Sequence, residues 1–121
     1  MDMSEETQNK LMQYQQIQQQ MQYLGVQRYQ LEVQLKESEK ALEAVSKLKA
    51  GTPIYRSVGS LLVKVEDVAA LKKELAEKKE SQELRVKTLE RQEKQMRERH
   101  EELGSTLEKA FSKGEGNARA G

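Results

Sequence analysis

Hydrophobic residues in the first part of the chain recur at alternating steps of three and four residues. With Tyr14 at position a of a heptad repeat, positions a and d hold Tyr14, Ile17, Met21, Leu24, Arg28, Leu31, Leu35, Ser38, Leu42 and Val45. All of these except Arg28 and Ser38 are apolar, and the residues between them are mostly Gln, Glu, Lys and Ser. This spacing is typical of a coiled-coil seam, because it keeps one narrow apolar stripe facing a partner helix.

The ends of this helix carry the expected signals. Ser4 suits an N-cap, and Glu5 and Glu6 follow in the first turn, where the helix dipole favours acidic side chains. Gly51 lies beyond the last seam residue, and a proline follows shortly after it, an order typical of a helix stop. The sequence therefore predicts a helix over about residues 5–49.

A second series of apolar residues begins at Val68. With Val68 at position a, the a positions are Val68, Leu75, Gln82, Leu89, Met96, Leu103 and Ala110. The d positions are mostly polar: Leu71, Lys78, Arg85, Gln92, Arg99 and Thr106. The sequence predicts a helix over about residues 67–112 whose seam has only one apolar leg, which means that only one of its two series of heptad positions is apolar. A local break in the heptad would let the stripe pass through Leu84 or Val86.

The pattern changes between the two helices, where β-forming residues gather around Gly59 and Ser60. Gly followed by Ser fits a two-residue type II′ turn, with Gly at the position that needs a positive φ. Counting outward from that turn pairs Val58 with Leu61, Arg56 with Val63, and Ile54 with Val65. These six residues share one face, so the sequence predicts a hairpin over about residues 53–65 that is apolar on one side.

These elements together predict a mainly α fold, a long antiparallel two-helix coiled coil with one central β-hairpin. We expect a single domain over residues 1–121. Residues 114–121 are small, polar and Gly-rich, so we expect a disordered tail there.

The hairpin has a consequence for assembly, because a lone two-stranded hairpin with open edges is at best marginally stable in water. Strands from other chains would bury its apolar face in a sheet or a β-barrel body. We therefore expect an oligomer that is held together by the hairpin residues Ile54, Tyr55, Val58, Gly59, Leu61, Leu62, Val63 and Val65.

An antiparallel pairing also brings the start of the first helix beside the end of the second. The apolar residues expected at this tip are Met1, Met3, Leu11, Leu103, Leu107, Ala110 and Phe111. Leu11 and Leu107 fall outside the predicted seams, so we expect the tip to show apolar groups to solvent. Flexible apolar side chains of this kind can repack around varied partners.

Charge argues against several classes of function. The 21 basic and 20 acidic residues give a net charge of +1, which provides neither the basic face of a nucleic-acid binder nor a polybasic membrane anchor. No apolar run is long enough to span a membrane, and the N-terminus is polar rather than signal-like. The chain has no Cys. We expect a soluble, cytoplasmic protein that binds neither nucleic acid nor membrane.

Nothing in the sequence indicates an enzyme. The single His, His100, falls at position e of the second helix among charged neighbours, where we expect a solvated side chain. The sequence has no Gly-rich phosphate loop and no spacing typical of metal ligands. We therefore expect no catalytic residues, no cofactor and no metal.

The run IYRSVGSLLVKV at residues 54–65, flanked by two long helices, closely resembles the β-type subunits of prefoldin. The resemblance covers roughly residues 5–112. The segment between the helices has room for one hairpin, whereas α-type subunits carry two, so the β-type is the better match.

The resemblance implies a hetero-hexamer of two α-type and four β-type subunits, with the hairpins in a double β-barrel body and six coiled-coil arms. It also implies an ATP-independent chaperone that holds unfolded proteins at the arm tips and delivers them to a group II chaperonin. The alternative is a structural coiled-coil tether or assembly scaffold. A tether would account for the heptads but not for an apolar hairpin, since a polar turn would suffice.

Overall fold

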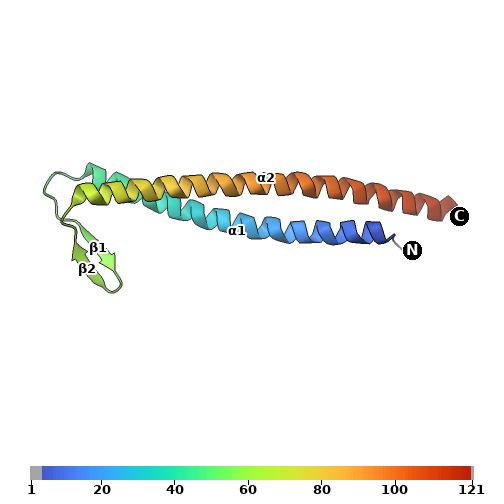
Figure 1. Cartoon of the computed structure of the whole chain (residues 1–121), viewed down its shortest axis with the longest axis horizontal. Helices are drawn as coiled ribbons and strands as arrows, with labels where there is room; N and C mark the ends of the chain where they lie inside the picture. The colour runs from blue at the N-terminus through green and yellow to red at the C-terminus, as the bar shows by residue number, and fades with distance from the viewer. Residues whose placement is uncertain (1–3, 121) are drawn as a thin grey trace. The chain divides into compact units, whose positions relative to one another are not determined.

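The computed structural model describes residues 4–120. Its elements are α1 (Glu5–Lys47), β1 (Tyr55–Val58), β2 (Leu61–Lys64) and α2 (Val68–Ala120), as Figure 1 shows. The expected fold class, two long helices around a central antiparallel hairpin, is confirmed.

Both helices begin at a side-chain cap. The backbone N–H of Thr7 donates to Ser4 Oγ at 3.1 Å, and the N–H of Ala70 donates to Asp67 Oδ1 at 3.0 Å. Each cap satisfies one of the amide groups that the first turn leaves without a helical partner. The predicted N-cap at Ser4 is therefore confirmed.

The end of α1 also follows its sequence signals. The helix ends at Lys47, two residues before the predicted boundary near 49, and Gly51 then adopts a φ of +83°. The N–H and the hydroxyl of Thr52 both donate to the carbonyl of Lys49, at 3.1 and 2.7 Å. Gly51 has no Cβ, so it takes the left-handed conformation without strain.

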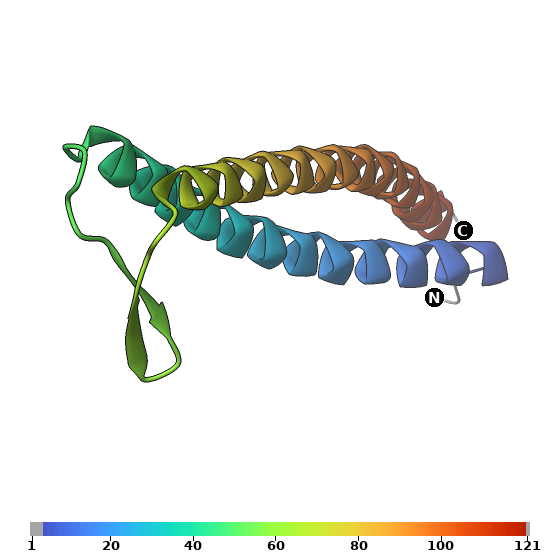
Figure 2. The same cartoon turned by 60° about the vertical axis from the view of Figure 1, so that its left-hand side comes forward.

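The described residues form two compact units. Unit 1 comprises residues 4–28 and 88–120, and unit 2 comprises residues 29–87. In each unit a segment of α1 packs antiparallel to a segment of α2, and the two segments lie side by side in both Figure 1 and Figure 2. Unit 2 also contains the hairpin.

The seam of α1 follows the predicted heptad. Leu24 in unit 1 and Leu31 and Ser38 in unit 2 are buried, and all three occupy predicted a or d positions. The other predicted seam residues of α1 are half-buried, while most residues between them are exposed. The predicted stripe on α1 is therefore confirmed.

The seam of α2 has two legs, and its second leg was predicted in the wrong place. Of the predicted d positions, Leu71 is half-buried, whereas Lys78, Arg85, Gln92, Arg99 and Thr106 are all exposed. The second leg instead lies four residues after each a position, at Lys72, Lys79, Val86, Glu93, His100 and Leu107. A 4,3 spacing keeps a stripe as narrow as a 3,4 spacing does, so the heptad needs no break. Of the two alternatives for the stripe, Val86 is buried and Leu84 is exposed.

The C-terminal part of the chain differs from expectation. The sequence predicts a helix end near residue 112 and a disordered tail over 114–121, whereas α2 continues to Ala120, and Gly121 lies outside the described residues. Gly114 and Gly116 each cost about 1 kcal/mol relative to Ala in a helix. The Ala, Glu and Arg residues among them have good helix propensity, and the propagation of an existing helix needs no new nucleus.

The hairpin has the predicted register. Val58 pairs with Leu61 and Arg56 with Val63, and the N–H of Val65 donates to the carbonyl of Ile54 at 2.8 Å. Gly59 has a φ of +60°, while no non-glycine residue in the described part of the chain has a positive φ. A positive φ at the first turn position alone is that of a type II′ turn, so the predicted turn is confirmed.

Candidate functional surfaces

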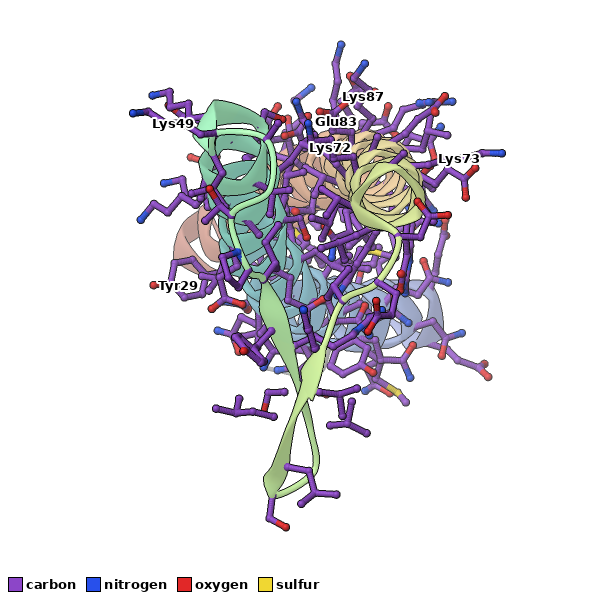
Figure 3. The ribbon with its side chains drawn as sticks, turned by 90° about the vertical axis from the view of Figure 1, so that its left-hand side faces the viewer. Tyr29, Lys49, Lys72, Lys73, Glu83 and Lys87 are labelled. Atoms are coloured by element: carbon purple, nitrogen blue, oxygen red, sulfur yellow. The ribbon has the colours of Figure 1, made fainter. Side chains whose placement is uncertain are left out.

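The hairpin of unit 2 exposes apolar side chains on both of its faces. Val58, Leu61 and Val63 are exposed on the face that was predicted to be apolar. On the opposite face, Leu62 is 75% exposed and Tyr55 is 59% exposed. Figure 3 shows the hairpin extending away from the two helices of unit 2, so neither helix covers its turn end. Such a concentration of exposed apolar side chains on a two-stranded element marks an interaction surface.

The base of the hairpin is partly covered. Ile54 and Val65 are half-buried, and the main-chain hydrogen bond between them extends the ladder by one pair. Gly59 lies at the opposite end, in the turn. The predicted oligomerisation residues thus divide into a half-buried base and an exposed remainder.

Arg56 is the one charged residue on the predicted apolar face, and the structure gives it a partner. Its Nη1 and Nη2 donate to the two carboxylate oxygens of Glu74 on α2, at 3.2 and 3.1 Å. The hydrogen bond from Arg56, and secondly its charge, lower the pKa of the Glu74 carboxyl. Both side chains are about half exposed, so the pair contributes more to the orientation of the hairpin on α2 than to stability.

The tip residues expected from the sequence behave differently from one another in unit 1. Leu103 and Leu107 are only 3% and 5% exposed, so the expectation that Leu107 falls outside the seam was wrong. Leu11 and Ala110 are half-buried, while Phe111 is 43% exposed. Met1 and Met3 lie outside the described residues. Among the predicted tip residues that the structure describes, Phe111 is therefore the one whose apolar side chain is exposed.

The position expected for His100 was also wrong. Its imidazole lies in the seam of unit 1, stacked on the ring of Tyr14 with centroids 4.1 Å apart and an interplanar angle of 17°. Its Nε2 is buried without a hydrogen-bond partner. The signal that sequence reasoning missed is its position four residues after Met96, on the true second leg.

Each of the two polar residues in the predicted α1 seam lies near a polar residue of α2. In unit 1, Arg28 Nε lies 2.5 Å from a carboxylate oxygen of Glu93, which is a second-leg residue of α2. In unit 2, Ser38 and Gln82 are both buried and line the same cavity of about 500 Å³. Polar residues in a coiled-coil seam reduce stability but fix the register of the helices.

Among residues 4–113, whose side chains the structure describes, no group of three or more His, Asp or Glu side chains is placed to hold a metal ion. Neither α1 nor α2, over the part of each that is described, contains a stretch apolar enough to cross a membrane.

The exposed hairpin and the two-legged seam define a class: an antiparallel coiled-coil subunit that carries an uncovered apolar β-hairpin. Residues 8–114 match the family described as prefoldin subunit. The chain belongs to the prefoldin family, whose members are chaperone subunits.

Individual relatives agree with this assignment. The prefoldin subunit beta of Archaeoglobus fulgidus is 47% identical over 109 residues, which cover 88% of this chain and 91% of that protein. The prefoldin subunit beta of Thermoplasma volcanium is 39% identical over 105 residues, with coverages of 87% and 85%. The crystal structure of the prefoldin beta subunit from Thermococcus strain KS-1 matches with a TM-score of 0.80 and 34% identity, covering 90% of this chain and 95% of that one. The predicted resemblance to a β-type subunit is confirmed.

Proposed function

We propose that the hairpin joins this chain to α-type prefoldin subunits and to further copies of itself, in a hexamer of two α-type and four β-type subunits. The observation that carries the proposal is the exposure of Val58, Leu61, Val63, Tyr55 and Leu62 on both faces of the hairpin. Added strands would pair the open edges, and a closed β-barrel would bury one apolar face inside the assembly.

The assembled protein acts in the cytoplasm as an ATP-independent chaperone. Unit 1 holds unfolded proteins, and the complex delivers them to a group II chaperonin. Phe111 is the principal contact in the described tip, supported by the half-buried Leu11 and Ala110. Met1 and Met3 belong to the same proposed surface. Leu103 and Leu107 support this surface from within the seam, since their side chains are already buried.

A coiled-coil tether or scaffold remains the competing function, and it predicts a different outcome in one assay. Light scattering of a chemically unfolded test protein is followed on dilution from denaturant, without ATP, in the presence of the hexamer. We expect the hexamer to suppress aggregation. Removal of eleven residues from each terminus (1–11 and 111–121) should leave assembly intact and abolish suppression, because it removes Phe111, Leu11 and the first turns of α1.

A matched pair of variants tests whether the side chain of Phe111 is needed for client binding. The variant Phe111→Ser should reduce suppression, while Lys109→Ser, an exposed neighbour in the same turn, should not. If the truncated hexamer suppresses aggregation as well as the full-length hexamer does, the tip is not the client-binding surface.

A further inference from the structure

The outer face of α1 in unit 1, on the side away from the seam, has an unusual composition. Met12, Tyr23 and Val26 are all exposed, Tyr23 by 65% of its surface. Each residue of a helix turns by about 100°, so these three lie within about 60° of one another. Leu24 and Ile17 are seam residues on the opposite side of the helix. Three large apolar side chains therefore lie where a coiled coil normally meets water.

This outer face also carries no charge. Its remaining residues are glutamines: Gln15, Gln16, Gln19 and Gln22. Between Lys10 and Glu32, the only charged residue is Arg28, which pairs with Glu93 in the seam. The chain as a whole is 34% charged, and α2 in unit 1 exposes Arg91, Lys94 and Glu98. The absence of charge is therefore a local property of α1.

The same chemistry recurs on the part of α1 that belongs to unit 2. Tyr29 and Val33 are exposed there. Figure 3 shows Tyr29 on the side of α1 that faces away from α2. A second, separate observation thus places an exposed tyrosine on the outer side of this helix.

We propose that the outer α1 face, defined by Met12, Tyr23, Val26 and the four glutamines, is a second client-binding surface, and that it takes extended, uncharged apolar segments of non-native polypeptide. This inference rests on the proposed chaperone function. It extends that function from the tip to the flank of the helix.

The chemistry of the outer α1 face favours segments of non-native polypeptide as its ligand. Folded proteins generally present charged surfaces, and an uncharged face offers them no complementary partner. An unfolded segment instead exposes apolar side chains together with main-chain amides. Glutamine amides can both donate to and accept from those amides, while Tyr and Met provide adaptable apolar contact.

A second copy of this chain is a poorer occupant. A coiled-coil seam needs apolar residues at every third or fourth position. Between Met12 and Tyr23 the outer face has only glutamines, so it lacks the continuous stripe that a helix partner would require.

Site-specific photocrosslinking in the assembled hexamer tests the inference. A benzophenone amino acid replaces Tyr23 in one variant, Phe111 in a second, and the exposed Lys94 of α2 in a third. The probe is a reduced and carboxamidomethylated test protein, which is permanently unfolded. We expect the probe to crosslink at positions 23 and 111 and not at 94.

Affinity measurements give the second readout. The double variant Tyr23→Ser/Val26→Ser should weaken binding of an uncharged, leucine- and phenylalanine-containing peptide by roughly tenfold, which corresponds to 1.4 kcal/mol. The double variant should still assemble as a hexamer. The control Arg91→Ser/Lys94→Ser on α2 should leave the affinity for this peptide unchanged.

The outcomes separate the inference from the function on which it rests. Crosslinking at 111 without crosslinking at 23 overturns the outer surface and leaves the tip function standing. Absence of crosslinking at both positions overturns the proposed function as well. Crosslinks at 23 that join two copies of the chain, or equally tight binding of an acidic peptide, also overturn the inference.

Discussion

The ring of Tyr14 on α1 stacks on the imidazole of His100 on α2, with 4.1 Å between centroids. The contact lies in the seam of unit 1, one helical turn before the buried Leu103. It shows that the second leg of the α2 seam runs through a histidine, and it accounts for a polar residue at a position that the heptad would fill with an aliphatic one.

Removal of the imidazole should loosen unit 1. An aromatic pair of this geometry contributes about 0.5–1.5 kcal/mol beyond its buried area. We expect His100→Ala to lower the free energy of local opening by about 1–2 kcal/mol, as measured by hydrogen exchange of the α1 and α2 amides in unit 1. Glu101→Ala, at the exposed neighbouring position, should change it little. Equal effects of the two variants would contradict the stacking contact.

Gly104 tests the same contact from the other side. A Cβ at this residue would lie 3.3 Å from Cε2 of Tyr14, whereas a Cβ at Gly25 would meet nothing within 4 Å. Replacement of a helical Gly by Ala gains up to about 1 kcal/mol. We expect Gly25→Ala to raise the thermal midpoint by the full gain and Gly104→Ala to raise it less.

The difference between the two glycines should depend on the tyrosine ring. In a Tyr14→Ala background, Gly104→Ala should recover the gain that Gly25→Ala shows. If Gly104→Ala is as stabilising as Gly25→Ala with Tyr14 present, the ring does not limit the approach of the helices.

Removal of one partner of the ion pair between Arg28 and Glu93 should destabilise the fold, whereas replacement of both partners by apolar residues should not. Glu93→Ala removes the Glu93 carboxylate from the guanidinium of Arg28 in the seam, and we expect a loss of about 1–3 kcal/mol in the free energy of unfolding. The double variant Arg28→Met/Glu93→Met, measured by chemical denaturation, should be close to neutral or stabilising. A double variant as unstable as Glu93→Ala would show that the charges themselves are needed.

The pair between Arg56 and Glu74 predicts a pH dependence in unit 2. Because Arg56 lowers the pKa of Glu74 in the folded chain, the contribution of the pair is fully present above the unfolded pKa of a glutamate. It is lost as the pH falls through the depressed folded value. An NMR titration of the Glu74 carboxyl should show a pKa below the ordinary value, and Arg56→Met should raise it toward that value. An unchanged titration in Arg56→Met would contradict the pairing.

The sequence was sufficient for the features that depend on neighbouring residues. Gly59-Ser60 determines the type II′ turn, and the turn in turn determines which residues pair in the hairpin. The α1 seam was predictable because Ile17, Leu24 and Leu31 mark a continuous apolar stripe.

The second leg of α2 could not be found in the same way, because it is largely polar. Lys72, Lys79, Glu93 and His100 are half-buried there, and their character depends on the facing helix. Arg28 accommodates Glu93, and Tyr14 accommodates His100. A single helix read in isolation shows neither partner, and for this reason Leu107 was placed outside the seam.

Native mass spectrometry of this chain, with and without an α-type prefoldin subunit, tests whether the exposed hairpin is the assembly surface. We predict a defined hexamer of two α-type and four β-type subunits in the mixture, and heterogeneous or poor assembly of the chain alone. Val58→Asp/Leu62→Asp, which places charge on both faces of the hairpin, should abolish the hexamer, while Lys109→Ser should not. A stable monomer with a folded hairpin, or a hexamer that tolerates both aspartates, would contradict the claim that the exposed hairpin is the assembly surface.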